Sequence, residues 1–175
     1  MKYVIVYLIK GRAKKYQERL TNEISSKFKI RNLNNHISPH ITLKTPFKKN
    51  NIKDIENFLD KFSKKKKKFK IKICRFGSFK NKVIYLNIVT DRNYFRFQGD
   101  LIESLSNNKL VYIRKIDLSY KPHATIGFAK NPMQFKKIMD FFAKYNPNFT
   151  LNFDNITILK KPKNKWILYK EFNLK

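Results

Sequence analysis

Two short segments of this chain decide its fold class and point to its chemistry: Ser38-Pro39-His40-Ile41-Thr42-Leu43 and Lys121-Pro122-His123-Ala124-Thr125-Ile126. Each alternates polar and apolar residues, which is typical of a half-buried strand. Residues i and i+2 of a strand point to the same face, so the histidine and the threonine of each segment should project together. The chain has 3 histidines, and the occurrence of two of them in one Pro-His-x-Thr pattern is improbable by chance.

The residues around these segments repeat one order of elements. Apolar spacing predicts helices over 13–28, 53–62, 93–106 and 132–144, and strands over 3–9, 40–44, 69–73, 83–89, 123–127, 151–158 and 166–172. Corresponding helices and motifs lie about 80 residues apart, which indicates a duplicated β/α unit. In this interpretation the first strand, 3–9, has no counterpart in the second half.

We therefore predict an α+β fold of two antiparallel-rich sheets with helices outside and a central cleft. The 175 residues should form one domain of two pseudo-symmetric lobes, approximately 1–92 and 93–175. An exchange of strands between the two lobes is compatible with this prediction. A pseudo-twofold relation between the lobes would bring both histidine–threonine pairs to the cleft.

The composition favours a polyanionic partner. The chain carries 40 Lys+Arg against 12 Asp+Glu, a formal net charge of +28, and such a field attracts nucleic acid. An AT-rich genome would also enrich lysine, although it should then raise glutamate as well. The run Lys64–Lys68 is read either as a solvated helix end or as an RNA-tracking patch.

Several classes of protein are disfavoured. Cys74 is the only cysteine, so an internal disulfide or a cysteine-based zinc cluster is excluded, and 3 histidines with few nearby carboxylates make a poor metal site. No apolar run approaches the length needed to cross a bilayer. We expect a cytoplasmic monomer that needs neither a metal nor another cofactor.

The paired motifs suit the chemistry of a phosphodiester. A neutral imidazole can take a proton from an attacking water or hydroxyl, and an opposing imidazolium can protonate the leaving oxygen. The hydroxyls of Thr42 and Thr125 can hold the non-bridging phosphate oxygens. His40 and His123 are therefore the candidate catalytic residues.

At these residues the sequence resembles the two-histidine (2H) phosphoesterase superfamily, and in particular the 2′-5′ RNA ligase-like cyclic phosphodiesterases. The opening Met1-Lys2-Tyr3, the strand Val83-Ile84-Tyr85 and the closing Trp166…Tyr169-Lys170-Glu171-Phe172 add to the resemblance. It implies metal-independent opening of 2′,3′-cyclic phosphate ends to a 2′-phosphate, and in some relatives reversible 2′-5′ joining of RNA. It also implies that His40 is the proton donor and His123 the proton acceptor.

Three neighbours of the motifs are further candidates for substrate contact. Lys44 follows His40 by four positions, so regular alternation places it on the same face, where it could neutralise phosphate or lie solvated at the rim. Phe47 and Tyr120 could stack on a base, although core packing is the commoner fate of a residue such as Phe47 and an even alternative for Tyr120.

Two other functions remain open. One is a non-catalytic basic RNA-binding protein on the same fold, and the other is a phosphodiesterase for a small cyclic nucleotide. A protein that only binds RNA has no need of two proton-transferring histidines. A phosphodiesterase for a small nucleotide predicts lysines scattered over every face of the molecule.

Overall fold

The computed structural model describes residues 1–175. Its helices are α1 (Gly11–Phe28), α2 (Lys53–Lys64), α3 (Arg92–Asn107), α4 (Lys115–Leu118) and α5 (Pro132–Phe142), with a 3-10 turn at Leu33–Asn35. Its strands are β1 (Lys2–Leu8), β2 (His40–Lys48), β3 (Phe69–Phe79), β4 (Val83–Val89), β5 (His123–Phe128), β6 (Asn148–Phe153), β7 (Asn155–Lys161) and β8 (Ile167–Asn173). None of the helices is long and apolar enough to cross a membrane.

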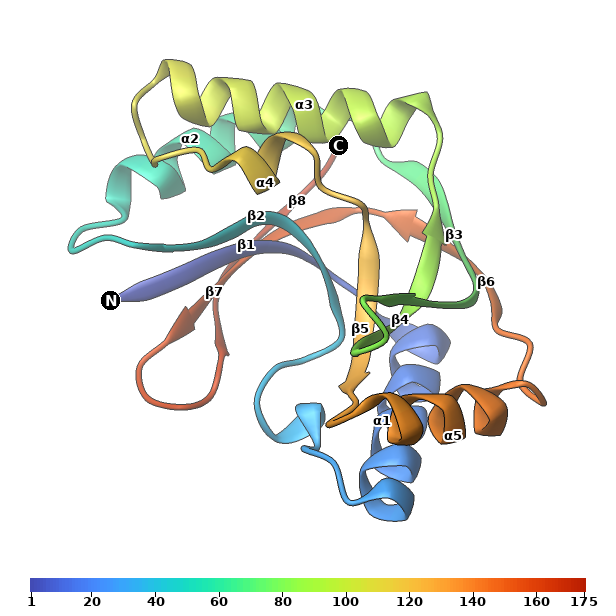
Figure 1. The fold of residues 1–175 in the computed structure, drawn as a ribbon. Helices are drawn as coiled ribbons and strands as arrows, with labels where there is room; N and C mark the ends of the chain where they lie inside the picture. The colour runs from blue at the N-terminus through green and yellow to red at the C-terminus, as the bar shows by residue number, and fades with distance from the viewer.

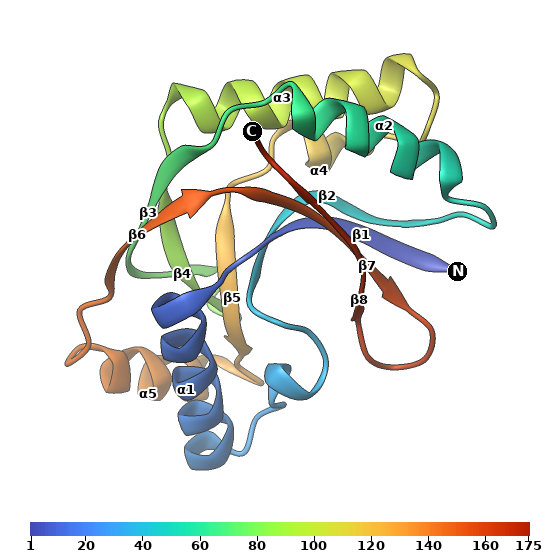
Figure 2. The ribbon, with the colours of Figure 1, turned by 180° about the vertical axis from the view of Figure 1, so that it is seen from behind.

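The strands form two four-stranded sheets, in the orders β2-β1-β7-β8 and β5-β4-β3-β6. All six strand pairs are antiparallel. Helices α2, α3 and α4 lie at one end of the molecule, whereas α1 and α5 lie at the other (Figures 1 and 2). The predicted α+β class with antiparallel sheets is confirmed.

The duplication includes the first strand, so the prediction that 3–9 has no counterpart is wrong. β1 pairs with β2 in one sheet, and β4 pairs with β5 in the other, in both cases antiparallel. Each His-x-Thr strand therefore lies beside the strand that precedes the first helix of its repeat. This relation was not apparent from the sequence, because β4 follows a tight turn from β3 and its pattern is typical of the second strand of a hairpin.

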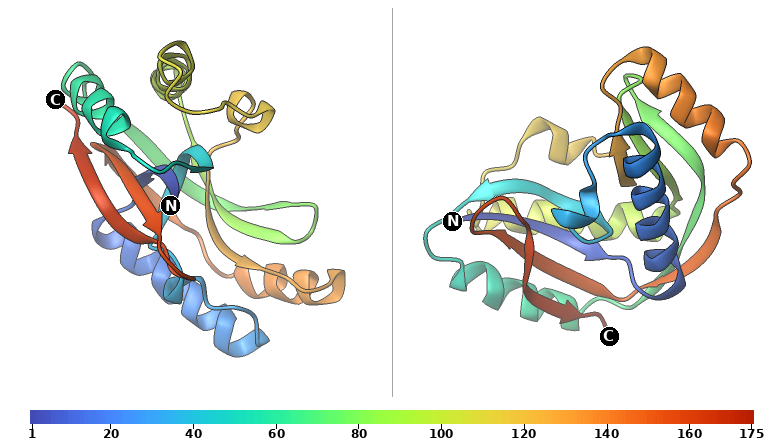
Figure 3. Two further views of the ribbon diagram at one scale, coloured as in Figure 1. Left: turned by 90° about the vertical axis from the view of Figure 1, so that its left-hand side faces the viewer. Right: turned by 90° about the horizontal axis from the view of Figure 1, so that it is seen from below.

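The sheets do not follow the two halves of the chain. β3, from the first half, lies in the second sheet, whereas β7 and β8 return to pair beside β1 in the first sheet (Figure 3). One continuous hydrophobic core of 33 buried residues joins the two sheets. Within it, Tyr7 of β1 stacks on Phe153 of β6 at 4.5 Å between ring centres, and burial of such side chains stabilises the fold by about 1.5–3 kcal/mol each.

Candidate active site

The two His-x-Thr strands are the edge strands of their sheets. β2 is first in one sheet and β5 is first in the other, and these two strands contact each other (Figure 1). His40, Thr42, His123 and Thr125 are all half-buried, while Ile41 and Ala124 between them are fully buried. The predicted alternation of each motif is thus observed, and the fold brings two motifs distant in sequence to one place.

Each motif strand carries an irregularity directly after its threonine. In β2, Thr42 pairs with Val6 and Lys44 with Ile5, so Leu43 is the extra residue of a bulge. In β5, Thr125 pairs with Tyr85 and Gly127 with Ile84, so Ile126 occupies the corresponding position. A bulge of one residue moves the following side chain to the opposite face of the sheet.

This bulge corrects the prediction that Lys44 shares a face with His40. Lys44 is only 1% exposed and points into the protein, where its Nζ lies 2.9 Å from Asp117 Oδ2. Its charge is therefore neutralised by a buried carboxylate and is not free for phosphate. At the matching position in β5, Gly127 leaves room for Ile24 of α1, which a Cβ would approach to 2.7 Å.

Both imidazoles are held by the same kind of hydrogen bond. His40 Nδ1 lies 2.8 Å from Ser38 O, and His123 Nδ1 lies 2.8 Å from Lys121 O. Because a carbonyl oxygen can only accept, Nδ1 must carry the proton in each ring. This leaves Nε2 of each histidine as the nitrogen that can exchange a proton with a substrate.

The environment of each imidazole lowers its pKa, and His123 contributes to the shift of His40. Burial lowers the pKa of His40 to about 4, the hydrogen bond to Ser38 opposes that shift, and the charge of His123 adds to it. Burial likewise lowers the pKa of His123, the hydrogen bond to the backbone of Lys121 opposes that shift, and the charge of Lys121 adds to it. The neutral forms are therefore favoured, and the negative charge of a phosphate would favour the protonated form of either ring.

Aromatic rings surround His123 on several sides. Its ring lies 4.9 Å from Phe79, 5.1 Å from Tyr85 and 5.2 Å from Tyr120, the last in a stacked arrangement. Gly77 permits this packing, because a Cβ there would come within 2.4 Å of the Tyr85 ring. Phe79, Tyr85 and Gly77 were not predicted as neighbours of the site, since their pairing is set by the β3–β4 register.

Tyr120 connects the two motifs. Burial raises the pKa of Tyr120 to about 12, and the neighbouring Thr42 opposes that shift. One face of its ring stacks on His123, so Tyr120 is itself part of the packing around this imidazole. Phe47 instead packs against Tyr3, with 6.0 Å between ring centres, at the margin of the core.

The buried polar residues that hold the motif strands in place were not predicted either, because they belong to no motif. Asp117 accepts hydrogen bonds from Thr45 N at 2.9 Å and from Arg114 N at 2.9 Å, besides its ion pair with Lys44. Gln17 of α1 donates from Nε2 to Thr125 O at 3.0 Å. Asp117 ties the segment leading to His123 onto β2, whereas Gln17 satisfies a carbonyl of the second motif.

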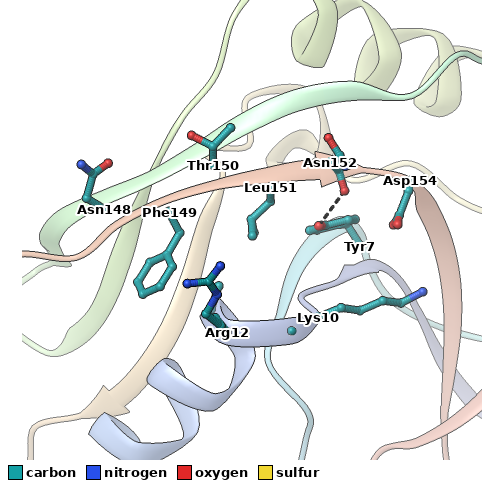
Figure 4. Close-up of a pocket in the computed structure, with 11 residues that line it drawn as sticks. Tyr7, Lys10, Arg12, Asn148, Phe149, Thr150, Leu151, Asn152 and Asp154 are labelled. Atoms are coloured by element: carbon teal, nitrogen blue, oxygen red, sulfur yellow. Dashed lines mark hydrogen bonds between the residues drawn. The ribbon is translucent and has the colours of Figure 1, made fainter.

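Neither a metal-ligand cluster nor the cavity beside the start of α1 involves the predicted site residues. No three His, Cys, Asp or Glu side chains are grouped as metal ligands would be. A cavity of about 520 Å³ lies between the start of α1 and the edge strand β6, where Tyr7 Oη donates to Asn152 O at 3.0 Å (Figure 4). It is lined by Lys10, Arg12 and Asp154 among others, and by none of the predicted catalytic or substrate-binding residues.

Comparison with known proteins agrees with this architecture. The family model of the 2′-5′ RNA ligase superfamily matches residues 14–165. A protein of Geobacillus sp. (strain WCH70), whose name assigns it to the phosphoesterases without stating a substrate, is 27% identical over 141 residues, covering 78% of each chain. A second such protein, from Geobacillus thermodenitrificans (strain NG80-2), is 25% identical over 143 residues, again covering 78% of each chain.

Solved structures share the fold at low sequence identity. The Thermus thermophilus protein TT0787 superposes with a TM-score of 0.68 at 16% identity, covering 99% of this chain and 98% of that one. E. coli LigT, solved in complex with 3′-AMP, superposes with a TM-score of 0.59 at 11% identity, covering 99% and 96%. The chain belongs to the 2′-5′ RNA ligase superfamily, the 2H phosphoesterases.

Proposed function

We propose that this protein is a phosphodiesterase that opens 2′,3′-cyclic phosphate ends of RNA to a 2′-phosphate without a metal ion. The observation that carries the proposal is the pair of imidazoles, each with Nδ1 bound to a backbone carbonyl at 2.8 Å and with Nε2 free. Two imidazoles close enough for the charge of His123 to lower the pKa of His40 can serve one phosphorus atom as acid and base.

In this reaction a water attacks the phosphorus while the bond to the 3′ oxygen breaks. His123 Nε2 takes the proton of the water, and His40 Nε2 gives a proton to the departing 3′ oxygen. The hydroxyls of Thr42 and Thr125 hold the non-bridging oxygens as their charge shifts. Return of both histidines to their starting states needs only a proton exchange with solvent. Attack on the cyclic phosphate by the 5′-hydroxyl of a second RNA in place of water, with the same departure of the 3′ oxygen, would give a 2′-5′ linkage.

The chain offers a matched control for the test, because His36 is its third histidine and lies outside both motifs. We expect His40→Ala and His123→Ala each to lower hydrolysis of a 2′,3′-cyclic nucleotide by about 10²–10⁴-fold, in the presence of EDTA. His36→Ala should keep the activity. Retention of activity in both motif variants, or its abolition by EDTA in the unaltered protein, would contradict the proposal.

The separate roles can be tested with a substrate whose leaving group is nitrophenolate, which departs without protonation. If His40 is the acid, His40→Ala should hydrolyse this substrate far better than the cyclic nucleotide, whereas His123→Ala should fail with both. The opposite pattern would exchange the two roles.

A further inference from the structure

The end of β7 and the turn that leads to β8 carry the sequence Lys160-Lys161-Pro162-Lys163-Asn164-Lys165-Trp166. Trp166 N donates a hydrogen bond to His36 O at 2.7 Å, and His36 Nδ1 lies 3.4 Å from Asn164 O. The turn therefore lies against the loop that leads into His40, as the views from the front and from behind both show (Figures 1 and 2).

Trp166 lies on the same face of the sheet as the first catalytic motif. His40 pairs with Leu8, and Thr42 pairs with Val6, and paired residues of neighbouring strands share a face. Trp166 and Leu8 pack against the small apolar cluster of Val4, Val6 and Leu159. The half-buried indole therefore packs on the same face of the sheet from which the imidazole of His40 projects.

The lysines of this turn have no acidic partners. Lys161, Lys163 and Lys165 form no ion pair, in contrast to Lys64, which pairs with Asp60 at 2.7 Å. Lys161 Nζ lies 5.9 Å from the centre of the Trp166 ring. Unneutralised cations around a flat aromatic ring suit single-stranded nucleic acid, whose phosphates and bases they can contact together.

We propose that Lys161, Lys163, Lys165 and Trp166, here named the hairpin surface, bind the single-stranded RNA whose cyclic phosphate end is held at His40 and His123. The proposal rests on the proposed function and extends it, because it makes a polymer the preferred substrate over a mononucleotide. The lysines would contact the phosphates upstream of the end, and the indole would stack on a base.

The decisive variant is the triple change Lys161→Gln, Lys163→Gln and Lys165→Gln. Its control is Lys65→Gln, Lys67→Gln and Lys68→Gln, which removes the same charge from three lysines between α2 and β3, at the other end of the molecule, that likewise form no ion pair. Binding of a single-stranded oligonucleotide ending in an uncleavable 2′-phosphate is measured by fluorescence anisotropy over a range of salt concentrations. Hydrolysis of a cyclic mononucleotide is measured alongside.

We expect the hairpin triple variant to weaken oligonucleotide binding by up to about 50-fold at about 0.15 M salt, and to reduce the slope of log K against log salt by about 2. Hydrolysis of the mononucleotide should stay within about twofold of the unaltered protein in both triple variants. Equal weakening by the control would attribute binding to overall charge, and greater weakening by it would place the RNA on the lysine run. Either result overturns the proposal.

Trp166→Leu tests the aromatic part, since leucine keeps an apolar contact with Val4 and Val6 but offers no flat ring. It should weaken oligonucleotide binding by about tenfold with an unchanged salt slope. Because the anisotropy assay involves no chemistry, an inactive protein that still binds RNA through this surface would contradict the proposed function alone. An active protein whose two triple variants bind alike would contradict the hairpin surface alone.

Discussion

Replacement of Asp117 by asparagine removes the negative partner of a buried lysine. The side chains of Lys44 and Asp117 are 1% and 0% exposed, and their charged atoms lie 2.9 Å apart. An asparagine can still accept the hydrogen bonds that Asp117 Oδ1 takes from Thr45 N and Oγ1. Its amide nitrogen, however, would face two other donors, Lys44 Nζ and Arg114 N.

Removal of one member of a buried ion pair leaves an uncompensated charge and costs about 3–5 kcal/mol. The whole free energy of unfolding of a domain is about 5–15 kcal/mol, so Asp117→Asn should remove a large part of it. For a chain of this length each kcal/mol lowers the Tm by about 2–4 °C, and we therefore expect the Tm to fall by about 10 °C.

The measurement is urea unfolding followed by circular dichroism, with Asp60→Asn as the matched control. Asp60 and Lys64 also form an ion pair at 2.7 Å, but their side chains are 50% and 71% exposed, and such pairs contribute less than about 1 kcal/mol. The paired replacement Lys44→Met with Asp117→Leu should recover part of the loss, since it leaves no buried charge. A cost below about 1 kcal/mol for Asp117→Asn, or a double variant as unstable as the sum of its singles, would refute this reasoning.

The effect should also depend on pH. Burial raises the pKa of Asp117, but hydrogen bonds from Thr45 and Lys44 outweigh burial and leave that pKa below its usual value. The stability that the carboxylate contributes is therefore present above the unfolded-state pKa of about 4 and is lost as the pH falls through the folded-state value. The difference in stability between the unaltered protein and Asp117→Asn should accordingly shrink in acid.

Further predictions concern the histidines and two glycines. The lowered pKa values of His40 and His123 place both limbs of the kcat/KM profile below about pH 6.5. Titration of the two imidazoles by NMR should give a lower pKa for His40 than for His123. Because the unfolded chain binds protons to these rings more readily, their contribution to stability should be lost as the pH falls below about 6.5. Gly77→Ala should displace the Tyr85 ring and lower both activity and stability. Gly99→Ala, in open space on α3, should instead stabilise the fold by about 0.5–1 kcal/mol. Equal melting temperatures of these two variants would contradict the packing described around His123.

Much of the fold was predictable from local patterns. All four helices expected from apolar spacing are present, because each is long enough to show its periodicity. The four-residue helix α4, Lys115–Leu118, was not predicted, since one turn is too short to show a period. The helix nevertheless carries Asp117, so a segment without any pattern supplies a buried anchor of the site.

By itself the sequence determined the two His-x-Thr strands, the helices around them and the excess of positive charge, because alternation and helical periodicity are local properties of the chain. Only the tertiary structure decided which side chains meet. The bulge after Thr42 moves Lys44 to the opposite face, the β3–β4 register places Gly77 under Tyr85, and the return of β7 beside β1 brings Trp166 to the loop before His40. Such contacts depend on pairing register and chain crossover, which involve residues far apart in the sequence and leave no periodic trace in it.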